Sequence, residues 1–295
     1  MGDRIVVVGD VMNDIVVVPR GPMRTDTDTD ARIQPRPGGS AANTAAWLGS
    51  LDASVDFVGS AGAAEADWHV EVLRQSGVSP HVQAVPGIPT GTIVLIIEGQ
   101  RRSMLTDRGA NAALDATQLT EELVAGAGHM HVSGYSITKD NARRAPCVMI
   151  ARALERGIPV SVDPASSGYV ADYGVERFLD DMGGVQLIFP NLDEGALLSG
   201  ETDPERIGAA LLERFPMVVL KMGAEGAILF RRDQPPLRVP APRVEKFVDP
   251  TGAGDAFAAG FLARWVADRD AEAATRQAVQ VAARAVMLIG GRPPI

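Results

Sequence analysis

The chain has 295 residues, of which 46% are hydrophobic and 22% are charged, so it can bury a large core and has the composition of a globular protein. Its formal net charge of -9 argues against a general binder of nucleic acid or of anionic membranes. The start of the chain holds only four consecutive apolar residues, at positions 5–8, before Gly9 and Asp10. That run is too short for a secretory signal or a membrane span, so we expect a cytoplasmic protein.

The first predicted element is a buried strand at residues 5–8, because this run is β-branched and apolar. Asp14 follows shortly after it, and a second short strand is expected at 15–18. Residues 20–37 are polar and contain proline, glycine and a Thr-Asp repeat. Alternating short polar residues bury little surface, so this segment is predicted to form a solvated, appended hairpin.

A glycine-rich motif follows, with the sequence Gly-Gly-Ser-Ala-Ala-Asn at residues 38–43, and it leads into a helix of small residues at 44–51. Gly38 and Gly39 would leave backbone amides accessible to a ligand, and Asn43 offers one donor and one acceptor group. Close packing of the helix on a sheet explains the same glycines equally well.

The next segments predict a strand at 55–58, a helix around 68–73, and a hairpin whose strands cover 92–97 and 103–105. The hairpin is a second piece of the appendage that begins with residues 20–37. Beyond residue 110 short apolar runs alternate with segments of helical spacing, and the runs cover residues 129–132, 160–162, 187–189 and 218–220. This alternation predicts an α/β fold with a parallel sheet covered by helices on both faces.

Polar residues stand just past these runs, namely Ser133-Gly134, Asp163, Asn191 and Lys221. In an open parallel sheet, ligands bind outside the carboxyl ends of the strands. One such residue would be explained by a strand end reaching water, but the group of them favours a cleft. His129 and His131 alternate along one of these strands without other metal ligands nearby, and we interpret them as structural.

The stretch from Asp249 to Phe257 reads Asp-Pro-Thr-Gly-Ala-Gly-Asp-Ala-Phe and precedes an apolar segment of helical spacing. Its glycines and the start of the helix would direct amide groups at one point, which favours a phosphate. Asp255 would stand beside that point, and we expect the helix dipole to favour its ionised, proton-accepting form. A glycine-rich turn capped by Asp255 is the alternative.

Several other phosphate-binding and catalytic motifs are absent. No lysine follows a glycine, so a Walker A loop cannot exist. The Rossmann fingerprint, the His-Glu-x-x-His zinc motif and the Gly-x-Ser-x-Gly elbow are missing too.

The sequence resembles the ribokinase-like (PfkB) family of carbohydrate kinases. Residues 38–43 are similar to the first signature of this family, and residues 249–257 closely resemble the second. Asn191-Leu192-Asp193-Glu194 resembles the family's Asn-x-x-Glu motif, and residues 221–226 resemble its nucleotide-side strand and glycine turn. The resemblance implies a three-layer α/β/α fold with a mostly parallel sheet, plus a small β-sheet lid.

The resemblance also implies roles for individual residues. Asp255 would be the base that takes the proton from the substrate hydroxyl, and the amides of Gly252, Ala253 and Gly254 would stabilise the transferring phosphoryl group. The substrate would be held by Asp14, Gly38, Gly39 and Asn43. On the nucleotide side the resemblance implies Asn191, Lys221, Gly223 and Gly226.

Two kinds of ion and one assembly are implied as well. Glu194 would organise Mg²⁺ beside ATP, through water, and Asp249 and Thr251 match positions that hold K⁺ in some members. Residues 11–37 and 86–108 would form the lid, which closes over the site and supplies a homodimer contact. Residues 1–10, 38–85 and 109–295 would form the core.

The substrate is less defined, because the family phosphorylates sugars, sugar acids, sugar phosphates and nucleosides. Residues 10–37 and 86–110 contain no aromatic residue on which a base could stack, so a small sugar is favoured over a nucleoside. Met12 and Ser40 depart from the ribose-specific pattern. Arg102 and Arg108 could recognise a carboxylate or phosphate, but solvated hairpin charges are the favoured interpretation. Kinases for nucleosides or sugar acids stay as alternatives, with a non-catalytic sugar-binding regulator as a remote one.

Overall fold

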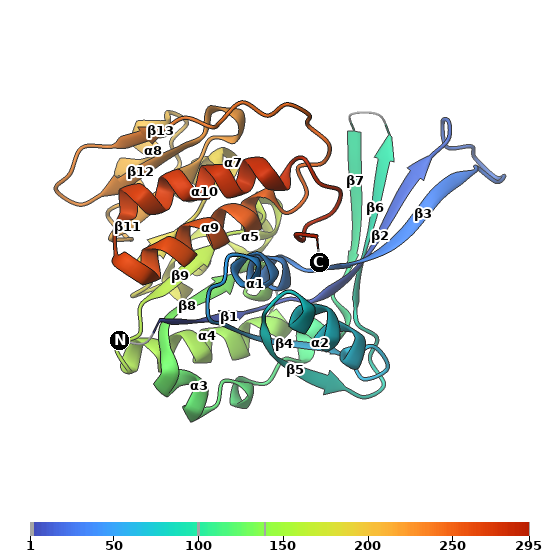
Figure 1. Ribbon diagram of the computed structural model, residues 1–295, viewed down its shortest axis with the longest axis horizontal. Coiled ribbons are helices and arrows are strands. Elements are labelled where there is room, and N and C mark those ends of the chain that lie inside the picture. Colours follow the sequence, from blue (N-terminus) through green and yellow to red (C-terminus); the bar gives the residue numbers. More distant parts are fainter. Residues whose placement is uncertain (1–2, 99–100, 139, 295) are drawn as a thin grey trace.

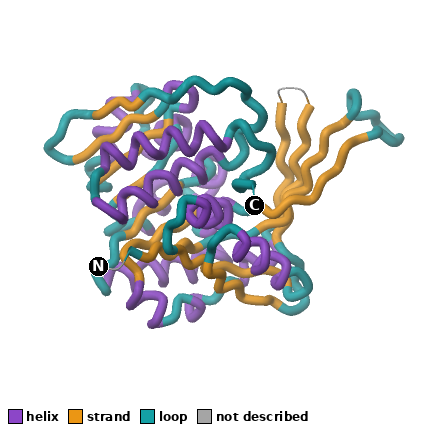
Figure 2. The backbone as a smooth tube through the Cα atoms, in the orientation of Figure 1, coloured by secondary structure: helices purple, strands orange, loops and turns teal. Residues whose placement is uncertain are grey.

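The computed structural model describes residues 3–98, 101–138 and 140–294, with every side chain in them except those of residues 101, 102 and 140–143. A large twisted sheet runs through the molecule, and a small sheet projects from one side of it (Figures 1 and 2). In spatial order the large sheet contains β13 (Leu237–Val239), β12 (Ala227–Arg231), β11 (Met217–Lys221), β10 (Leu187–Ile188), β9 (Val160–Asp163), β8 (Ala127–Ser133), β1 (Arg4–Val8), β4 (Val55–Gly62) and β5 (Ser79–Val85).

The strands from β11 to β5 are parallel, whereas β12 and β13 are antiparallel additions at one edge. The predicted mostly parallel sheet is therefore confirmed. Each predicted apolar run in it became a strand, because β-branched residues buried on both faces suit a central parallel strand. Strands β5, β12 and β13 have no counterpart among the predicted elements. β5 is an edge strand containing Pro80, and its burial pattern does not alternate cleanly.

Helices cover both faces of the large sheet. One face carries α1 (Ser40–Ser50), α2 (Ala66–Gln75), α9 (Ala253–Asp268) and α10 (Ala271–Ala285). The other carries α3 (Glu121–Gly126), α4 (Asp140–Glu155), α5 (Ser167–Tyr173), α6 (Val175–Asp181), α7 (Leu192–Ser199) and α8 (Pro204–Leu211). The three-layer architecture is confirmed. In the described part of the chain no helix is both long and apolar enough to cross a membrane.

Alternation along the central strands builds one core on each face. In β1 the side chains of Ile5 and Val7 enter the core beneath α1 and α9, whereas Val6 and Val8 enter the core beneath α4. Burying an aliphatic side chain of this size stabilises the fold by about 1.5–3 kcal/mol. The same strand therefore packs against both helix layers. This packing fixes the end of the strand, where the polar residues follow.

The small sheet has the order β3 (Ala31–Gly38), β2 (Met12–Pro19), β6 (Gly91–Glu98) and β7 (Arg101–Asp107). The predicted second sheet and its hairpin are confirmed. The segment expected to be a solvated hairpin contains a full strand, β3, despite Pro35 and Pro37. Among the described strands β3 pairs only with β2, and an edge strand tolerates residues that lack an amide donor.

The histidines of β8 have the structural role expected of them. His129 Nε2 and His131 Nδ1 lie 2.8 and 2.9 Å from the Ser161 hydroxyl, and both rings are buried. Burial lowers the pKa of His129 to about 3 and that of His131 to about 4, so both are neutral at physiological pH.

Candidate active site

The two glycine-rich motifs meet around the Asp255 carboxylate. Asp255 lies in the first turn of α9, where Ser40 Oγ donates a hydrogen bond of 2.7 Å to Oδ1 and Asn43 Nδ2 donates one of 3.0 Å to Oδ2. Ser40 and Asn43 are three residues apart on α1, so they project from the same face of that helix. Residues that are more than 200 positions apart in the chain are thereby joined at one carboxylate.

The protonation of Asp255 differs from the sequence-based expectation. Burial raises the pKa of Asp255 to about 7, although the hydrogen bonds from Ser40 and Asn43 oppose the shift. The effect expected from the helix dipole stays a prediction, and the net shift of the pKa is upward because the cost of desolvation is larger than the effect of the two hydrogen bonds. An aspartate with a pKa near 7 is well matched to a proton-accepting role at neutral pH.

Helix α9 begins without a side-chain cap. Its N-cap is Gly252, whose φ of 74° lies in the left-handed region. A Cβ at this position would stand 2.4 Å from Gly291 Cα, so only glycine fits. The amide of Ala253 donates to Pro250 O at 3.2 Å and closes a turn. It is one of the three amides that were expected to bind phosphate. The end of a 16-residue helix remains a favourable anion site.

Lys221 lies directly over this helix end. A Cβ at Gly254 would stand 3.2 Å from Lys221 Nζ and 4.0 Å from an Asp163 carboxylate oxygen. Nζ itself forms a 2.6 Å ion pair with Asp163 Oδ2, and the two side chains are 13% and 6% exposed. Burial alone would lower the pKa of Lys221, but the charges of Asp163 and Glu194 raise it. The lysine is therefore a fixed cation beside the start of α9.

Asn191 and Glu194 form a capping box at the start of α7. Asn191 Oδ1 accepts from the Glu194 amide at 2.9 Å, and Glu194 Oε2 accepts from the Asn191 amide at 2.8 Å. Burial raises the pKa of Glu194 to about 7, and Lys221 opposes that shift. The strand-end residues Asp163, Asn191 and Lys221 thus come together, since Asn191 also bridges to Lys221.

A magnesium ion would find oxygen donors here but no complete cage. Within the described residues there is no cluster of three or more acidic, histidine or cysteine side chains able to hold a metal. The charge of Asp163 contributes to the raised pKa of Glu194, so the two carboxylates lie near each other. Mg²⁺ keeps several of its waters and binds proteins through one or two carboxylates, so these residues fit a water-mediated site.

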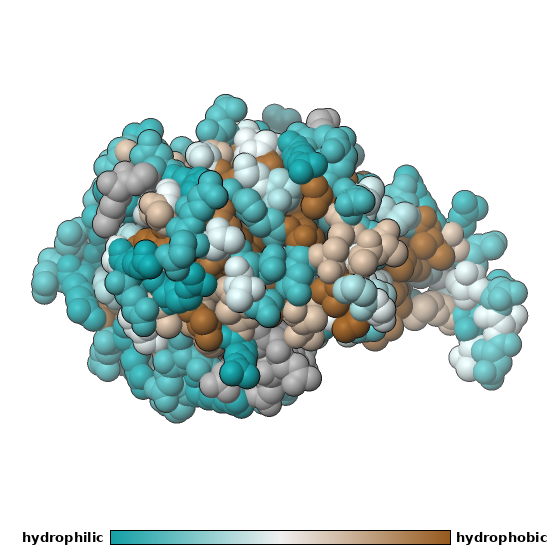
Figure 3. All heavy atoms as spheres, turned by 90° about the horizontal axis from the view of Figure 1, so that it is seen from below, coloured by the Kyte–Doolittle hydropathy of each residue, from teal (hydrophilic) through white to brown (hydrophobic). Residues whose placement is uncertain are grey.

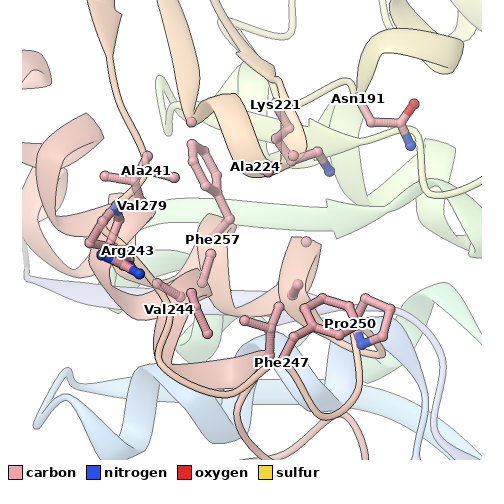
Figure 4. Close-up of a pocket in the computed structure, with 18 residues that line it drawn as sticks. Asn191, Lys221, Ala224, Ala241, Arg243, Val244, Phe247, Pro250, Phe257 and Val279 are labelled. Atoms are coloured by element: carbon pink, nitrogen blue, oxygen red, sulfur yellow. The ribbon is translucent and has the colours of Figure 1, made fainter.

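A cavity of about 630 Å³ opens beside Lys221 (Figure 4). Its walls are mainly apolar, and they are formed by Asn191, Lys221, Gly223, Ala224, Gly226, Ala241, Pro242, Arg243, Val244, Phe247, Pro250, Ala253, Gly254, Phe257, Val279, Ala282, Ala283 and Val286. The size is typical of a small-molecule site. Gly226 has a φ of 98°, and a Cβ there would stand 2.0 Å from Val239 O. The predicted nucleotide-side residues therefore share one cavity, whose outer wall from 241–247 and α10 was missed.

On the other side of Asp255, an arginine near the chain end organises the predicted substrate residues. Arg292 Nε donates to Asn43 Oδ1 at 3.2 Å, and its Nη2 donates to Gly38 O at 2.8 Å. Burial raises the pKa of Asp14 to about 7, while Arg292 opposes the shift. A Cβ at Gly38 would lie 2.1 Å from Asp14 Cγ, so glycine gives the carboxyl group its space. Arg292 was missed because a lone arginine after two glycines carries no motif.

The amides at the start of α1 are occupied by Asp10. Its Oδ2 accepts from the Ser40 amide at 2.8 Å, and its Oδ1 accepts from the Ala41 amide at 3.2 Å. Gly39 has a φ of 94°, and a Cβ there would stand 2.5 Å from Asp10 O. Close packing against Asp10 therefore explains why residue 39 is a glycine. Binding of a ligand by its amide was the other interpretation.

The predicted potassium residues contact each other. Asp249 Oδ1 accepts from the Thr251 amide at 2.9 Å and from its hydroxyl at 2.7 Å, and Oδ2 accepts from the Gly290 amide at 3.0 Å. These bonds hold the loop before α9 against the chain end. K⁺ binding at Asp249 and Thr251 stays a prediction.

Arg108 is not a solvated hairpin charge, contrary to the favoured interpretation. It is partly buried, with its guanidinium carbon 5.2 Å from the ring centre of Tyr135 and 4.7 Å from that of Tyr169. These tyrosines lie outside residues 10–37 and 86–110, and only folding brings them next to the small sheet. The side chain of Arg102 lies outside the described residues.

Comparison with known proteins identifies the family. The model of the "pfkB family carbohydrate kinase" matches residues 3–295. An ATP-dependent ribose-1-phosphate kinase from Halopiger xanaduensis is 32% identical over 82% of this chain and 77% of its own length. The bifunctional protein HldE from Pseudomonas fluorescens is 31% identical over 85% of this chain. The chain spans about half of HldE, 53% of its length.

Solved structures have the same fold over nearly the full chain. Adenosine kinase from Sinorhizobium meliloti has a TM-score of 0.89 at 24% identity, covering 100% of this chain and 96% of that one. A putative ribokinase II from E. coli in complex with ATP and Mg²⁺ has a TM-score of 0.86 at 22% identity, covering 99% and 94%. Ribokinase from Arabidopsis thaliana, complexed with ribose and ATP, has a TM-score of 0.81 at 27% identity, covering 98% and 94%. With its fold, its two glycine-rich motifs at one aspartate and a family match over residues 3–295, the chain belongs to the pfkB family of carbohydrate kinases.

Proposed function

We propose that this kinase transfers the γ-phosphoryl group of ATP to a hydroxyl group of a small sugar, with Asp255 as the base. One observation carries the proposal. Asp255 stands at the uncapped start of α9, between the apolar cavity beside Lys221 and the polar groups around Asp14. Phosphoryl transfer asks mainly for positioning and charge stabilisation, and this arrangement offers both.

The proposed reaction begins with a substrate hydroxyl placed against Asp255. Hydrogen bonds from Ser40 and Asn43 fix the plane of the carboxylate, so one lone pair can accept the hydroxyl proton as the oxygen attacks the γ-phosphorus. Asp14 and Asn43 orient the sugar, and Arg292 holds Asn43 in place. Negative charge on the transferring group is stabilised by the start of α9 and by Lys221.

ATP would place its base and ribose in the apolar cavity, with its phosphates at Lys221. Mg²⁺, when bound, offsets phosphate charge and orients the β- and γ-phosphates. Glu194 and Asn191 would hold it through water. Each accepts a hydrogen bond from the other's amide, and this fixes both side chains at the start of α7. The ATP- and Mg²⁺-bound structure of the E. coli ribokinase II, which shares the fold, supports these cofactors.

The pH dependence of turnover tests the base. Because the pKa of Asp255 is raised to about 7, we expect kcat/KM to increase about tenfold per pH unit below 7 and to level off above it. The ionised form accepts the proton, so activity follows deprotonation. Asp14 also titrates near 7, and the Asp14→Asn variant should keep the acid limb at lower absolute activity. A flat profile from pH 5.5 to 8 would contradict the assignment.

A nucleoside kinase is the second candidate, and one observation favours it. The ring centres of Tyr135 and Tyr169 lie 5.9 Å apart, and both rings contact Arg108 at the end of the small sheet. However, Arg108 already occupies the space against both rings. ADP release measured against a panel of sugars, sugar phosphates, sugar acids and nucleosides separates the candidates. Binding without ADP release from the whole panel would support a regulator.

We also propose that the small sheet, residues 11–37 and 86–108, is a lid over the core and a homodimer contact. Apolar side chains are exposed on it, with Ile33 61%, Met104 60% and Leu105 62% exposed. Brown, hydrophobic surface is visible on this side of the molecule (Figure 3). We expect sedimentation to give about twice the 31.1 kDa of one chain, and Leu105→Glu to shift the protein toward the monomer. A monomeric wild type at micromolar concentration would contradict the contact.

A further inference from the structure

One guanidinium group is held rigidly beside the proposed substrate site. Arg108 follows β7, and its side chain stacks against Tyr135 and Tyr169, whose rings are tilted 75° to each other. Its Nη1 donates to the backbone oxygen of Tyr135. Two aromatic contacts and one hydrogen bond restrict the rotation of the group, so its remaining donors point in one direction.

Those remaining donors have no acceptor in the described structure. Nε and Nη2 of Arg108 are both buried without a hydrogen-bond partner. Together they form one edge of the planar guanidinium fork, which is the geometry that binds two oxygens of a carboxylate or phosphate at once. Leaving charged donors buried and unpaired is costly, so an acceptor from outside the chain is expected there.

The position of Arg108 connects this edge to the substrate side of Asp255. Asn111 Nδ2 donates to Arg108 O at 3.0 Å and to Val11 O at 2.9 Å, which ties Arg108 to the start of β2. Asp14 lies on that strand, two residues after the buried Met12 and therefore on the same face. The charges of Asp10 and Asp255 also contribute to the raised pKa of the stacked Tyr135, after burial as the main cause.

Two further arginines, beside the proposed substrate residues Asp14 and Asn43, carry spare donors. Arg36 Nε and Arg292 Nη1 are also buried, and neither has a partner among the described residues, which makes four such guanidinium nitrogens with the two of Arg108. Arg36 Cδ stands 3.3 Å from the Cβ position of Gly290, two residues before Arg292. A sugar hydroxyl donates as well as accepts, whereas a phosphate ester offers three oxygens that only accept. These four donors outnumber the one unpaired acceptor of the proposed substrate residues, Asp14 Oδ1. The excess of cationic donors favours the phosphate over a neutral sugar, and over a carboxylate with two oxygens.

We propose that the substrate is a sugar that already carries a phosphate ester, and that Nε and Nη2 of Arg108 bind two oxygens of this ester side by side. The ester is separate from the hydroxyl that attacks ATP. This inference rests on the proposed sugar kinase function and narrows its substrate class. Arg108 is a specificity-determining residue, since it acts on a part of the substrate that does not react.

The test compares neutral pentoses and hexoses with their monophosphate esters and with the matching sugar acids, using ADP release. We expect the wild type to prefer a sugar monophosphate by at least about 100-fold in kcat/KM, because a bidentate, charge-assisted pair is lost with the neutral sugar. In Arg108→Gln, kcat/KM for that ester should fall by about 100-fold, mainly through KM. The value for the neutral sugar should change less than threefold. Arg108→Lys should recover only part of the loss, because an ammonium group cannot bind side by side.

Arg32→Gln is the matched control, because Arg32 is an exposed arginine of the same small sheet. It should leave both kinetic constants unchanged. The melting temperature and ATP binding of each variant show whether it is folded. A wild type that prefers neutral sugars or sugar acids, or an Arg108→Gln variant that loses activity equally on neutral and phosphorylated sugars, overturns the proposal. If none of the sugars, phosphorylated or not, causes ADP release from ATP, the proposed sugar kinase function itself is contradicted.

Discussion

Replacing Asp255 by asparagine is expected to lower kcat by about 10²–10⁴-fold, the range of a lost general base. The amide has nearly the same shape and can still accept from Ser40, but it cannot take the substrate proton. KM for ATP should stay close to the wild-type value, because the apolar cavity beside Lys221 is untouched. Steady-state ADP release with the best substrate of the panel measures both constants.

Stability provides the control for this variant. The pKa of Asp255 is raised from 3.8 to about 7 in the folded chain, so the ionised carboxylate destabilises the fold. The stability of the fold begins to fall as pH rises through 3.8, and this contribution is lost completely above pH 7. Asp255→Asn should therefore melt at a higher temperature than the wild type at pH 8, with little of that gain at pH 4. If Asp255→Asn is stably folded and its turnover is near normal, Asp255 is not the general base.

The second large effect is expected at the buried ion pair. Lys221→Met should lower the free energy of unfolding by about 3–5 kcal/mol, because it leaves a buried Asp163 carboxylate without its partner. Denaturant unfolding without ATP measures the loss. The variant should also bind ATP more weakly, since Lys221 faces the start of α9 at Gly254.

A double variant tests whether the loss comes from the unpaired charge. Asp163→Asn combined with Lys221→Met removes both charges, and it should recover much of the stability lost by Lys221→Met alone. Lys246→Met is the matched control, because Lys246 is exposed, and it should change stability by about 0.5 kcal/mol or less. If the double variant is no more stable than Lys221→Met, the missing pair is not the cause.

Much of the fold could be predicted, because burial on both faces selects long β-branched runs and these runs are visible in the sequence. Some elements could not be recognised from the sequence, each for a specific reason. β3 contains Pro35 and Pro37 and, among the described strands, pairs only with β2. Helix α10 is rich in alanine, so its buried face has little hydrophobic contrast. Such elements depend on neighbours that are distant in sequence.

The site divides in the same way. Glycine-rich segments near Gly38 and Gly252 are readable because close approach and positive φ admit only glycine. Arg292 and the tyrosines that enclose Arg108 carry no local pattern. They gain a role only through contacts with residues more than twenty positions away.

The sequence by itself determined the layered α/β fold, the family resemblance and the position of the central aspartate, because strand periodicity and glycine geometry are local properties. Only the tertiary structure decided how that site is charged. Burial set the pKa of Asp255 and of Asp14 near 7, and folding placed Arg108 between two rings with one edge unpaired. Desolvation and hydrogen-bond pairing depend on everything that surrounds a group, so they exist only once the chain is folded.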